Sequence, residues 1–284
     1  MSNLQNKIDF VVLVKVENAN PNGDPLNGNR PRTTYSGNGE ISDVCIKRKI
    51  RNRLQDMGEN LFVQSSERSD DGYTSLSERA SKTITSYKDN DDYAKQACEK
   101  WIDVRSFGQV FAFKSSDKKE SVSVGVRGPV SVHQAISCSP VDINSMQITK
   151  SVNSEPTKDG KKTSDTMGTK HYVDFGLYKI KGSINVQQAE KTGFSEGDAE
   201  KIKEALRTLF INDSSAARPD GSMEVVKIYW WKHNNKIGQY SAAKVHDSVK
   251  VTLKEDVAVP SSVDDYVITV EELTDLAPEV IEGI

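Results

Sequence analysis

The chain is short of hydrophobic residues and of cysteine, and each shortage excludes a class of protein. Hydrophobic residues make up 36% of the 284 positions, and no apolar run approaches the length that crosses a bilayer, so no contact with a membrane is expected. The three cysteines, Cys45, Cys98 and Cys138, are odd in number and far apart. This predicts reduced thiols, without a disulfide framework or a zinc motif. Since the N-terminus also lacks a signal-peptide pattern, we expect a cytoplasmic protein.

Motifs for cofactor and metal chemistry are missing as well. The glycines of residues 23 to 39 have neither phosphate-loop nor dinucleotide spacing. The four histidines show no metal-ligand spacing, so surface or strand positions are a better interpretation than ligands. No Cys/His or Ser/His grouping suggests a nucleophile. We therefore expect no cofactor, no metal and no catalytic residue. The histidines are His133, His171, His233 and His246.

Charge, by contrast, is distributed unevenly along the chain. The formal net charge is only -3, which by itself does not predict a nucleic-acid binder. Residues 30–53 hold seven Lys and Arg against Glu40 and Asp43, a local balance of +5. Residues 254–284 hold nine acids against Lys254, a balance of -8. This asymmetry permits a polyanion site in the first segment.

The first fifty residues predict a strand, a turn-rich loop and a basic helix. Ile8 to Val16 is a nearly continuous apolar run, typical of a buried central strand. Three turn dipeptides between Asn20 and Pro25 end that strand. Ser42 or Asp43 can cap a helix whose Lys and Arg side chains occupy two flanks. Its core-facing residues, at a spacing of four, are Ile46, Ile50 and Leu54. The helix either offers two basic edges to a polyanion or is merely a solvated surface.

Further strands and one helix complete the expected fold. Residues 171–186 and 225–231 read as strands, and residues 122–132 read as a core strand that ends in or is interrupted by Gly128-Pro129. Residues 195–210 read as a helix capped by Ser195. The order strand, helix, strand, strand, helix, strand is that of a ferredoxin-like fold. We therefore predict an α+β protein with one palm-type domain over residues 1–284. Its expected excursions are a polar insertion at 57–100, a lysine-bearing insertion at 137–170 with a projecting hairpin, and the acidic segment 254–284.

Two features offer both a functional and a structural interpretation. Asp24 could serve RNA chemistry as a general base or metal ligand, or it could brace its turn by hydrogen bonds to the backbone. No acid or histidine lies near it in sequence, which favours the bracing role. Trp230 and Trp231 could stack on bases, but adjacent strand positions face opposite ways. Core packing is the more economical prediction for both.

Several blocks of the sequence resemble one CRISPR family, the backbone subunit of type I-C Cascade surveillance complexes in the RAMP superfamily. The first block is the strand with its Glu-Asn-x-Asn-Pro-Asn-Gly-Asp-Pro loop at residues 17–25. It continues with Arg30-Pro31-Arg32 and with the basic helix from Asp43 to Arg51. Supporting blocks are found at residues 125–130, 166–171 and 175–178. The resemblance covers most of residues 8–231 in order.

The resemblance implies a hand-like, non-catalytic protein with an RNA-recognition-motif palm, fingers at 57–100 and a thumb at 137–170. Copies would polymerise along a guide RNA and display its bases to target DNA. Further implied partners are other Cascade subunits and a helicase-nuclease recruited by the complex. Met146, Ile148 and Met167 are candidates for a wedge that displaces a base, although ordinary hairpin packing is the more economical role for any one of them. The implied RNA-binding residues are Asn22, Arg30, Arg32, Ser42, Lys47, Arg48, Arg51 and Lys170.

The physical chemistry of the basic segment agrees with that implication. A subunit that accepts any guide should contact phosphate and sugar, which Lys, Arg and backbone N–H groups can do. Two other classes remain open at this point. One is an RNA-guided endoribonuclease that uses Asp24. The other is a sequence-specific RNA-binding monomer, for which the aromatic signature is missing.

Overall fold

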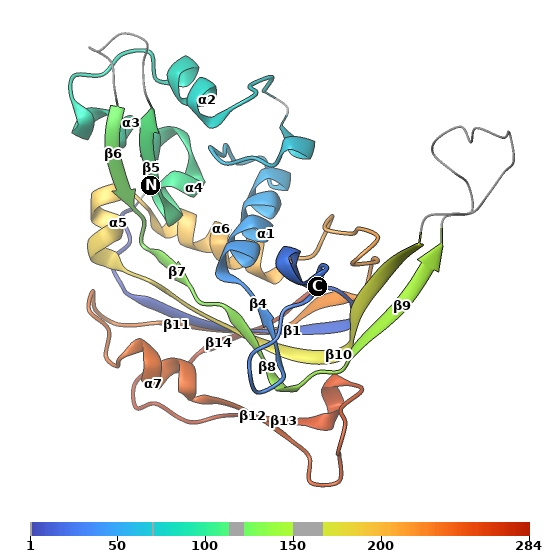
Figure 1. Cartoon of the computed structure of the whole chain (residues 1–284). Coiled ribbons are helices and arrows are strands. Elements are labelled where there is room, and N and C mark those ends of the chain that lie inside the picture. The colour runs from blue at the N-terminus through green and yellow to red at the C-terminus, as the bar shows by residue number, and fades with distance from the viewer. Residues whose placement is uncertain (1, 70, 114–121, 150–166) are drawn as a thin grey trace, which may run out of the picture.

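The computed structural model describes residues 2–69, 71–113, 122–149 and 167–284. The chain is a mixed α/β protein built on a large antiparallel sheet (Figure 1). The strand order is β14-β11-β1-β10-β8-β4, and β7 and β9 pair with β10 as well. The strands are β1 (Ile8–Ala19), β4 (Asn38–Ile41), β7 (Val130–Val132), β8 (Ala135–Pro140), β9 (Ile143–Thr149), β10 (Met167–Ile184), β11 (Met223–Lys232) and β14 (Glu279–Glu282).

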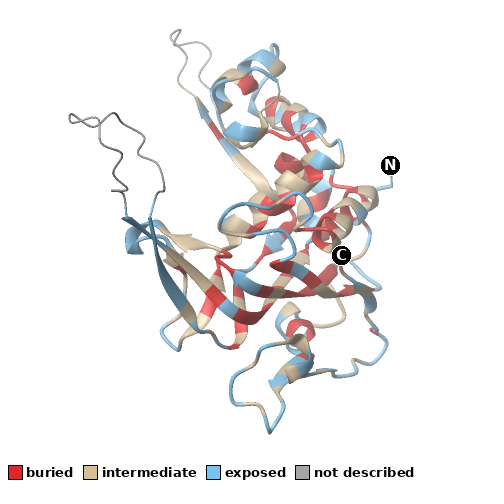
Figure 2. Cartoon of the chain, turned by 90° about the vertical axis from the view of Figure 1, so that its right-hand side faces the viewer, coloured by how far each residue is buried: buried red, intermediate tan, exposed pale blue. Residues whose placement is uncertain are grey.

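Strand β1 lies at the centre of the sheet, as its apolar run predicted. It pairs antiparallel with β10 on one side and β11 on the other, and Phe10 to Val14 are fully buried. Phe10 stacks on Trp230 with ring centroids 5.3 Å apart. A Cβ at Gly182 would stand 2.1 Å from the Phe10 ring, so this position of β10 requires glycine. The central strands are the buried red band in Figure 2.

Helices cover one face of the sheet. They are α1 (Asp43–Asp56), α5 (Val186–Thr192) and α6 (Glu196–Arg207). Ser42 caps α1 by accepting from the Cys45 amide, and Ser195 and Asp198 form a capping box at α6. The apolar face of α1 is buried against the sheet, as expected. Along the chain β1, α1, β8, β10, α6 and β11 follow one another, and in space the four strands stand in the order β11-β1-β10-β8.

The prediction of a core strand over residues 122–132 that ends in or is interrupted by Gly128-Pro129 is confirmed at the interruption and wrong for residues 122–127. β6 (Val122–Arg127) leaves the main sheet and pairs with β5 (Gly108–Phe113), while β7 alone joins the main sheet. The break falls at Gly128-Pro129, where proline has no N–H to donate. A Cβ at Gly128 would stand 2.3 Å from the Ser106 carbonyl oxygen, because the chain crosses the end of α4 (Ile102–Phe107) at that point.

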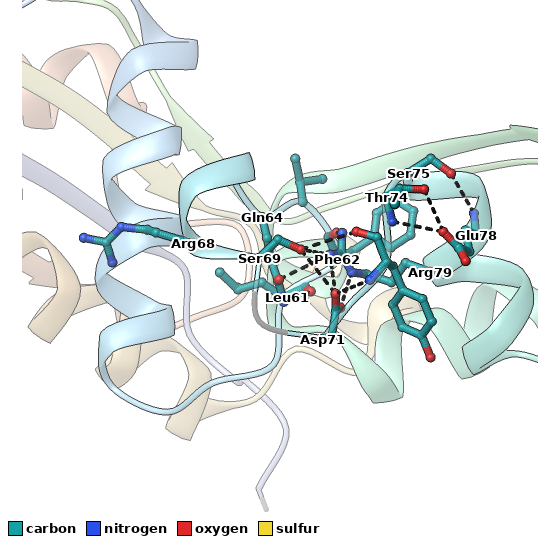
Figure 3. A network of polar contacts seen from close by, with 12 residues as sticks. Leu61, Phe62, Gln64, Arg68, Ser69, Asp71, Thr74, Ser75, Glu78 and Arg79 are labelled. Atoms are coloured by element: carbon teal, nitrogen blue, oxygen red, sulfur yellow. Dashed lines mark hydrogen bonds and ion pairs between the residues drawn. The ribbon is translucent and has the colours of Figure 1, made fainter.

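The polar insertion forms a second body with its own core. It contains α2 (Leu76–Thr83) and α3 (Asn90–Lys100), and its buried cluster draws residues from Phe62 to Phe111, so it continues past residue 100. Residues 102–107 of this body form the helix α4. Figure 3 shows how Arg79 ties the incoming chain to α2: its guanidinium donates to both Asp71 oxygens, to the Phe62 carbonyl and to the Ser69 hydroxyl.

The other face of the sheet is covered by the C-terminal segment. α7 (Ala242–Asp247) and the pair β12 (Val249–Leu253) and β13 (Tyr266–Val270) form a third cluster there, which includes Trp231. Trp230 packs on the opposite face, so the prediction of core packing for both tryptophans is confirmed. Within the described residues, no helix is both long and apolar enough to span a bilayer.

Candidate nucleic-acid interface

The loop between β1 and α1 is folded back onto the start of the helix. The Asn22 side-chain oxygen accepts from the Ser42 amide and from the Ser42 hydroxyl, each at 2.9 Å. The Asn20 amide donates to the Asn29 carbonyl at 2.7 Å, and β2 (Gly23–Asp24) pairs with β3 (Arg30–Pro31). Asn22 and Ser42 therefore lie together and set the angle at which the loop meets α1.

Asp24 has the contacts of a residue that braces a turn. Its Oδ1 accepts from the Leu26 amide at 3.2 Å, which caps a short 3-10 helix (Pro25–Asn27), and lies 3.5 Å from the Arg32 guanidinium. In the described part of the chain, no group of three or more His, Cys, Asp or Glu side chains is placed to hold a metal ion. The local geometry thus accounts for Asp24 through backbone and arginine contacts.

Arg30 connects the loop to the projecting hairpin of β9 and β10. Its Nη1 donates to the Ser145 hydroxyl at 2.9 Å and lies 3.4 Å from His171 Nδ1. Arg32 keeps 37% of its side chain exposed, and its Nε is buried without a hydrogen-bond partner among the described residues. The structure therefore brings Arg30 of the loop to the base of the hairpin, 115 positions away in sequence.

The basic residues of α1 are more tightly held than their sequence suggests. Arg51 Nε donates at 3.0 Å to Asp103, a carboxylate that also accepts from the Phe62 and Val63 amides and is fully buried. Arg48 donates to the Val63 carbonyl at 2.9 Å. Both guanidinium groups thus fasten the insertion to α1.

The second flank of α1 does not form a free basic edge. Lys49 is buried in an ion pair with Asp213, and burial lowers its pKa. Arg53 donates to the Thr208 hydroxyl of the segment after α6 at 2.7 Å. The expectation that both basic edges remain available is therefore wrong for this flank, because α6 and its following loop pack on it. Lys47, whose partner Asp43 is one turn away at 3.0 Å, faces the other side.

Lys47 lines a pocket that sequence reasoning did not find. The pocket has a volume of about 310 Å³ and joins Lys47 to the chain from Arg127 to Ser131 and to the start of α5. Arg127 is exposed and has no ion-pair partner in the described residues. Lys47 and Arg127 are 80 positions apart, so only the crossing of β6 over α4 brings them to one cavity. Two cations in one cavity suit a phosphate group.

The hairpin of β9 and β10 exposes apolar side chains. Met146, Ile148 and Met167 are 50%, 48% and 71% exposed. The register of β9 and β10 pairs Met146 with Lys170 and Ile148 with Gly168, so these four positions share one face of the hairpin. Figure 2 shows the exposed hairpin standing away from the sheet. Of the insertion expected at 137–170, residues 137–140 belong to β8 of the main sheet, and residues 143–149 and 167–170 belong to this hairpin. Residues 150–166 lie outside the described residues.

Comparisons with known proteins agree on one family. The model of a family described as CRISPR-associated protein Cas7 matches residues 6–271. A CRISPR-associated protein Cas7 of Haloferax volcanii is 24% identical over 298 aligned positions, covering 98% of this chain and 85% of that protein.

Solved structures extend the comparison to the fold. A chain of a CRISPR RNA-guided surveillance complex, pre-nicking, matches 83% of this chain and 81% of its own length, with 15% identity and a TM-score of 0.50. A chain of another CRISPR RNA-guided surveillance complex covers 85% of this chain and 74% of its own length, with 14% identity and a TM-score of 0.47.

Proposed function

Because the chain belongs to the Cas7 family of CRISPR-associated proteins, we propose that it is a non-catalytic backbone subunit of a type I-C Cascade surveillance complex. Copies of it polymerise along a guide RNA and present the guide for pairing with target DNA. Its partners are the guide, the target DNA, further copies of itself, other Cascade subunits and a helicase-nuclease that the complex recruits. The complex works in the cytoplasm.

The observation that carries this proposal is the contact between Arg30 and the hairpin. It places the basic loop, the exposed apolar hairpin and the loop's junction with α1 in one connected surface. Phosphates can be held by Arg30, Arg32, Lys170 and the pair Lys47 and Arg127, while Asn22 and Ser42 position the loop. None of these contacts requires a particular base, as a guide of any sequence demands.

The same assignment gives each part of the fold a role. The strand order β11-β1-β10-β8 with α1 and α6 on one face supports a ferredoxin-like palm. The insertion with its own core serves as fingers and the β9–β10 hairpin as the thumb. Met146 and Ile148 act as the wedge that displaces a base of the guide beside a neighbouring copy. Arg48 and Arg51 act on RNA only indirectly, by holding the fingers against α1.

The test is the mass of protein bound to RNAs of increasing length and unrelated sequence, measured by light scattering. Bound mass should rise in steps of one 31.5 kDa protomer. The variant Met146→Ser/Ile148→Ser should assemble less well on long RNA, while binding of one copy to short RNA is less affected. Ile237→Ser, which changes an apolar side chain 78% exposed in a loop after β11, is the matched control and should behave as wild type.

Two results would replace the proposal. Bound mass that stays at one protomer on every length would favour an RNA-binding monomer. RNA recovered from the same mixtures, with and without divalent metal, should be intact. Cleavage that disappears in Asp24→Ala would favour the RNA-guided endoribonuclease instead.

A further inference from the structure

A second basic surface lies on the face of the sheet opposite α1. A groove of about 450 Å³ opens between the β8–β10 edge of the sheet and β12 of the C-terminal segment. Lys179 and Lys181 project into it from β10, and His133 and Gln134 line it from the turn between β7 and β8. The main sheet lies between β12, which lines this groove through Val251, and α1, which carries Lys47 (Figure 1).

Lys179 is the unusual group in this groove. Its ammonium donates to the Val249 carbonyl at 2.8 Å, and no carboxylate of the described residues lies within ion-pair distance of it. Burial lowers the pKa of Lys179, so its charged form gains from any anion that enters. Lys181 pairs with Asp247 at 2.8 Å, but 61% of the Asp247 side chain is exposed and can turn away. A partly buried cation without a counter-ion points to an anionic ligand.

The remaining walls are neutral and partly apolar. Ile136, Cys138 and Val251 line the groove, and burial raises the pKa of the Cys138 thiol to about 11, which keeps it uncharged. No carboxylate belongs to the lining. The exposed residue His133 also lines the groove, with its ring edge-on to that of His246 at a centroid distance of 5.8 Å, and imidazole is among the side chains on which bases stack. The groove therefore offers cations for phosphates next to apolar and flat surfaces for bases.

We propose that this groove binds the backbone of a single-stranded nucleic acid, separately from the guide-binding surface. Lys179 and Lys181 are two residues apart on one strand, about 7 Å, so they can take successive phosphates. The inference rests on the proposed function in one respect. A subunit that displays a guide for pairing meets the single strands of an opened duplex, and a strand held on this face leaves the guide surface unobstructed.

The experiment uses the full chain loaded with unlabelled RNA and titrated with a labelled, non-complementary oligothymidylate at several salt concentrations. Lys179→Gln/Lys181→Gln should weaken oligothymidylate binding about tenfold and reduce the salt slope by about 1.4, which corresponds to two phosphate contacts of a single strand. Uptake of RNA should not change. Lys250→Gln removes a neighbouring charge that does not line the groove and should leave both affinities as in wild type.

The outcomes separate this inference from the proposed function. Oligothymidylate binding that is equal in the double variant and wild type would overturn the groove. If the double variant fails to fold, Lys181→Gln alone should still lower the affinity, and an unchanged affinity would overturn it equally. Competition by polyglutamate as strong as by oligothymidylate of equal charge would mean an acidic peptide site. If the chain does not load RNA but binds oligothymidylate through Lys181, the proposed function is wrong and the assignment of the groove is kept.

Discussion

Two basic segments follow each other along this chain, the loop of residues 22–32 and the helix α1, and they use their charges differently. In α1, Arg51 neutralises the buried Asp103 and Lys49 is enclosed with Asp213. In the loop, Arg30 has an exposed hydrogen bond to Ser145 and a partly buried contact with His171, and Arg32 keeps more than a third of its side chain exposed. Local charge density does not tell which arginines are available to a ligand. The burial of the carboxylate with which an arginine pairs is the better indicator of whether that arginine is available.

The largest expected effect comes from Arg51→Ala. It would leave Asp103 buried without its counter-ion, and breaking a buried pair from one side costs about 3–5 kcal/mol. The free energy of unfolding, measured by urea denaturation with tryptophan fluorescence, should fall by that order. Lys47→Ala removes a cation from the same helix, but its pair with Asp43 is on the surface, so the loss should be below about 1 kcal/mol.

Equal losses in these two variants would contradict the contrast between an arginine paired with a buried carboxylate and a lysine paired at the surface. Arg51→Lys refines the result, because it retains the charge beside Asp103 but loses the guanidinium's contact with the Phe107 ring, whose centroid is 5.0 Å away. Its stability should lie between those of Arg51→Ala and wild type.

A smaller effect, and on RNA affinity rather than stability, is expected for Arg30→Ala. The hydrogen bond to Ser145 is exposed, so the free energy of unfolding should change by about 1 kcal/mol or less. RNA binding followed by anisotropy should weaken about tenfold, and its salt slope should fall by about 0.7, the value for one phosphate of a single strand. Arg207→Ala, which removes an arginine paired with Glu204 on α6, serves as control. A salt slope unchanged by Arg30→Ala would remove this residue from the interface.

Much of this region follows from the sequence, because its signals are local. The apolar run of β1, the end of that strand before Asn20 and the cap at Ser42 depend on residues within a few positions of each other. The buried stripe of α1 has a fixed spacing and was predicted correctly.

The partners of the basic residues could not be predicted in the same way. Arg51 is separated from Asp103 by 52 positions, and Arg30 from Ser145 by 115. Arg127 lies in the supporting block at residues 125–130 but was not predicted as a site residue, because it lines one pocket with Lys47 only where β6 crosses α4. The packing of the insertion decides which cation is enclosed and which is left for a ligand. No periodic pattern in the sequence encodes that packing.

The smallest expected effect is the pH dependence of stability on the other face of the sheet. It tests whether the packing of the insertion on α1 is independent of the C-terminal segment that covers that face. That cover is anchored by His246, whose Nε2 donates to the Gly182 carbonyl at 2.8 Å, and by the buried Asp9. Burial lowers the pKa of His246 below its ordinary 6.5. Burial would raise the pKa of Asp9, but hydrogen bonds from His233, Lys7 and Ser183 bring it below 3.8.

Both shifts make the unfolded chain bind protons more readily than the folded one. Stability should therefore be full above pH 6.5, decrease as the pH falls below it because of His246, and decrease again below pH 3.8 because of Asp9. Hydrogen exchange at pH 8 and pH 5, corrected for intrinsic rates, should show α7 losing protection while α1 keeps it. His246→Gln retains a donor towards Gly182 without titrating and should reduce the loss. If α1 and α7 lose protection equally, the two faces open as one unit, and the fastening of α1 by Arg51 is not an independent element of the fold.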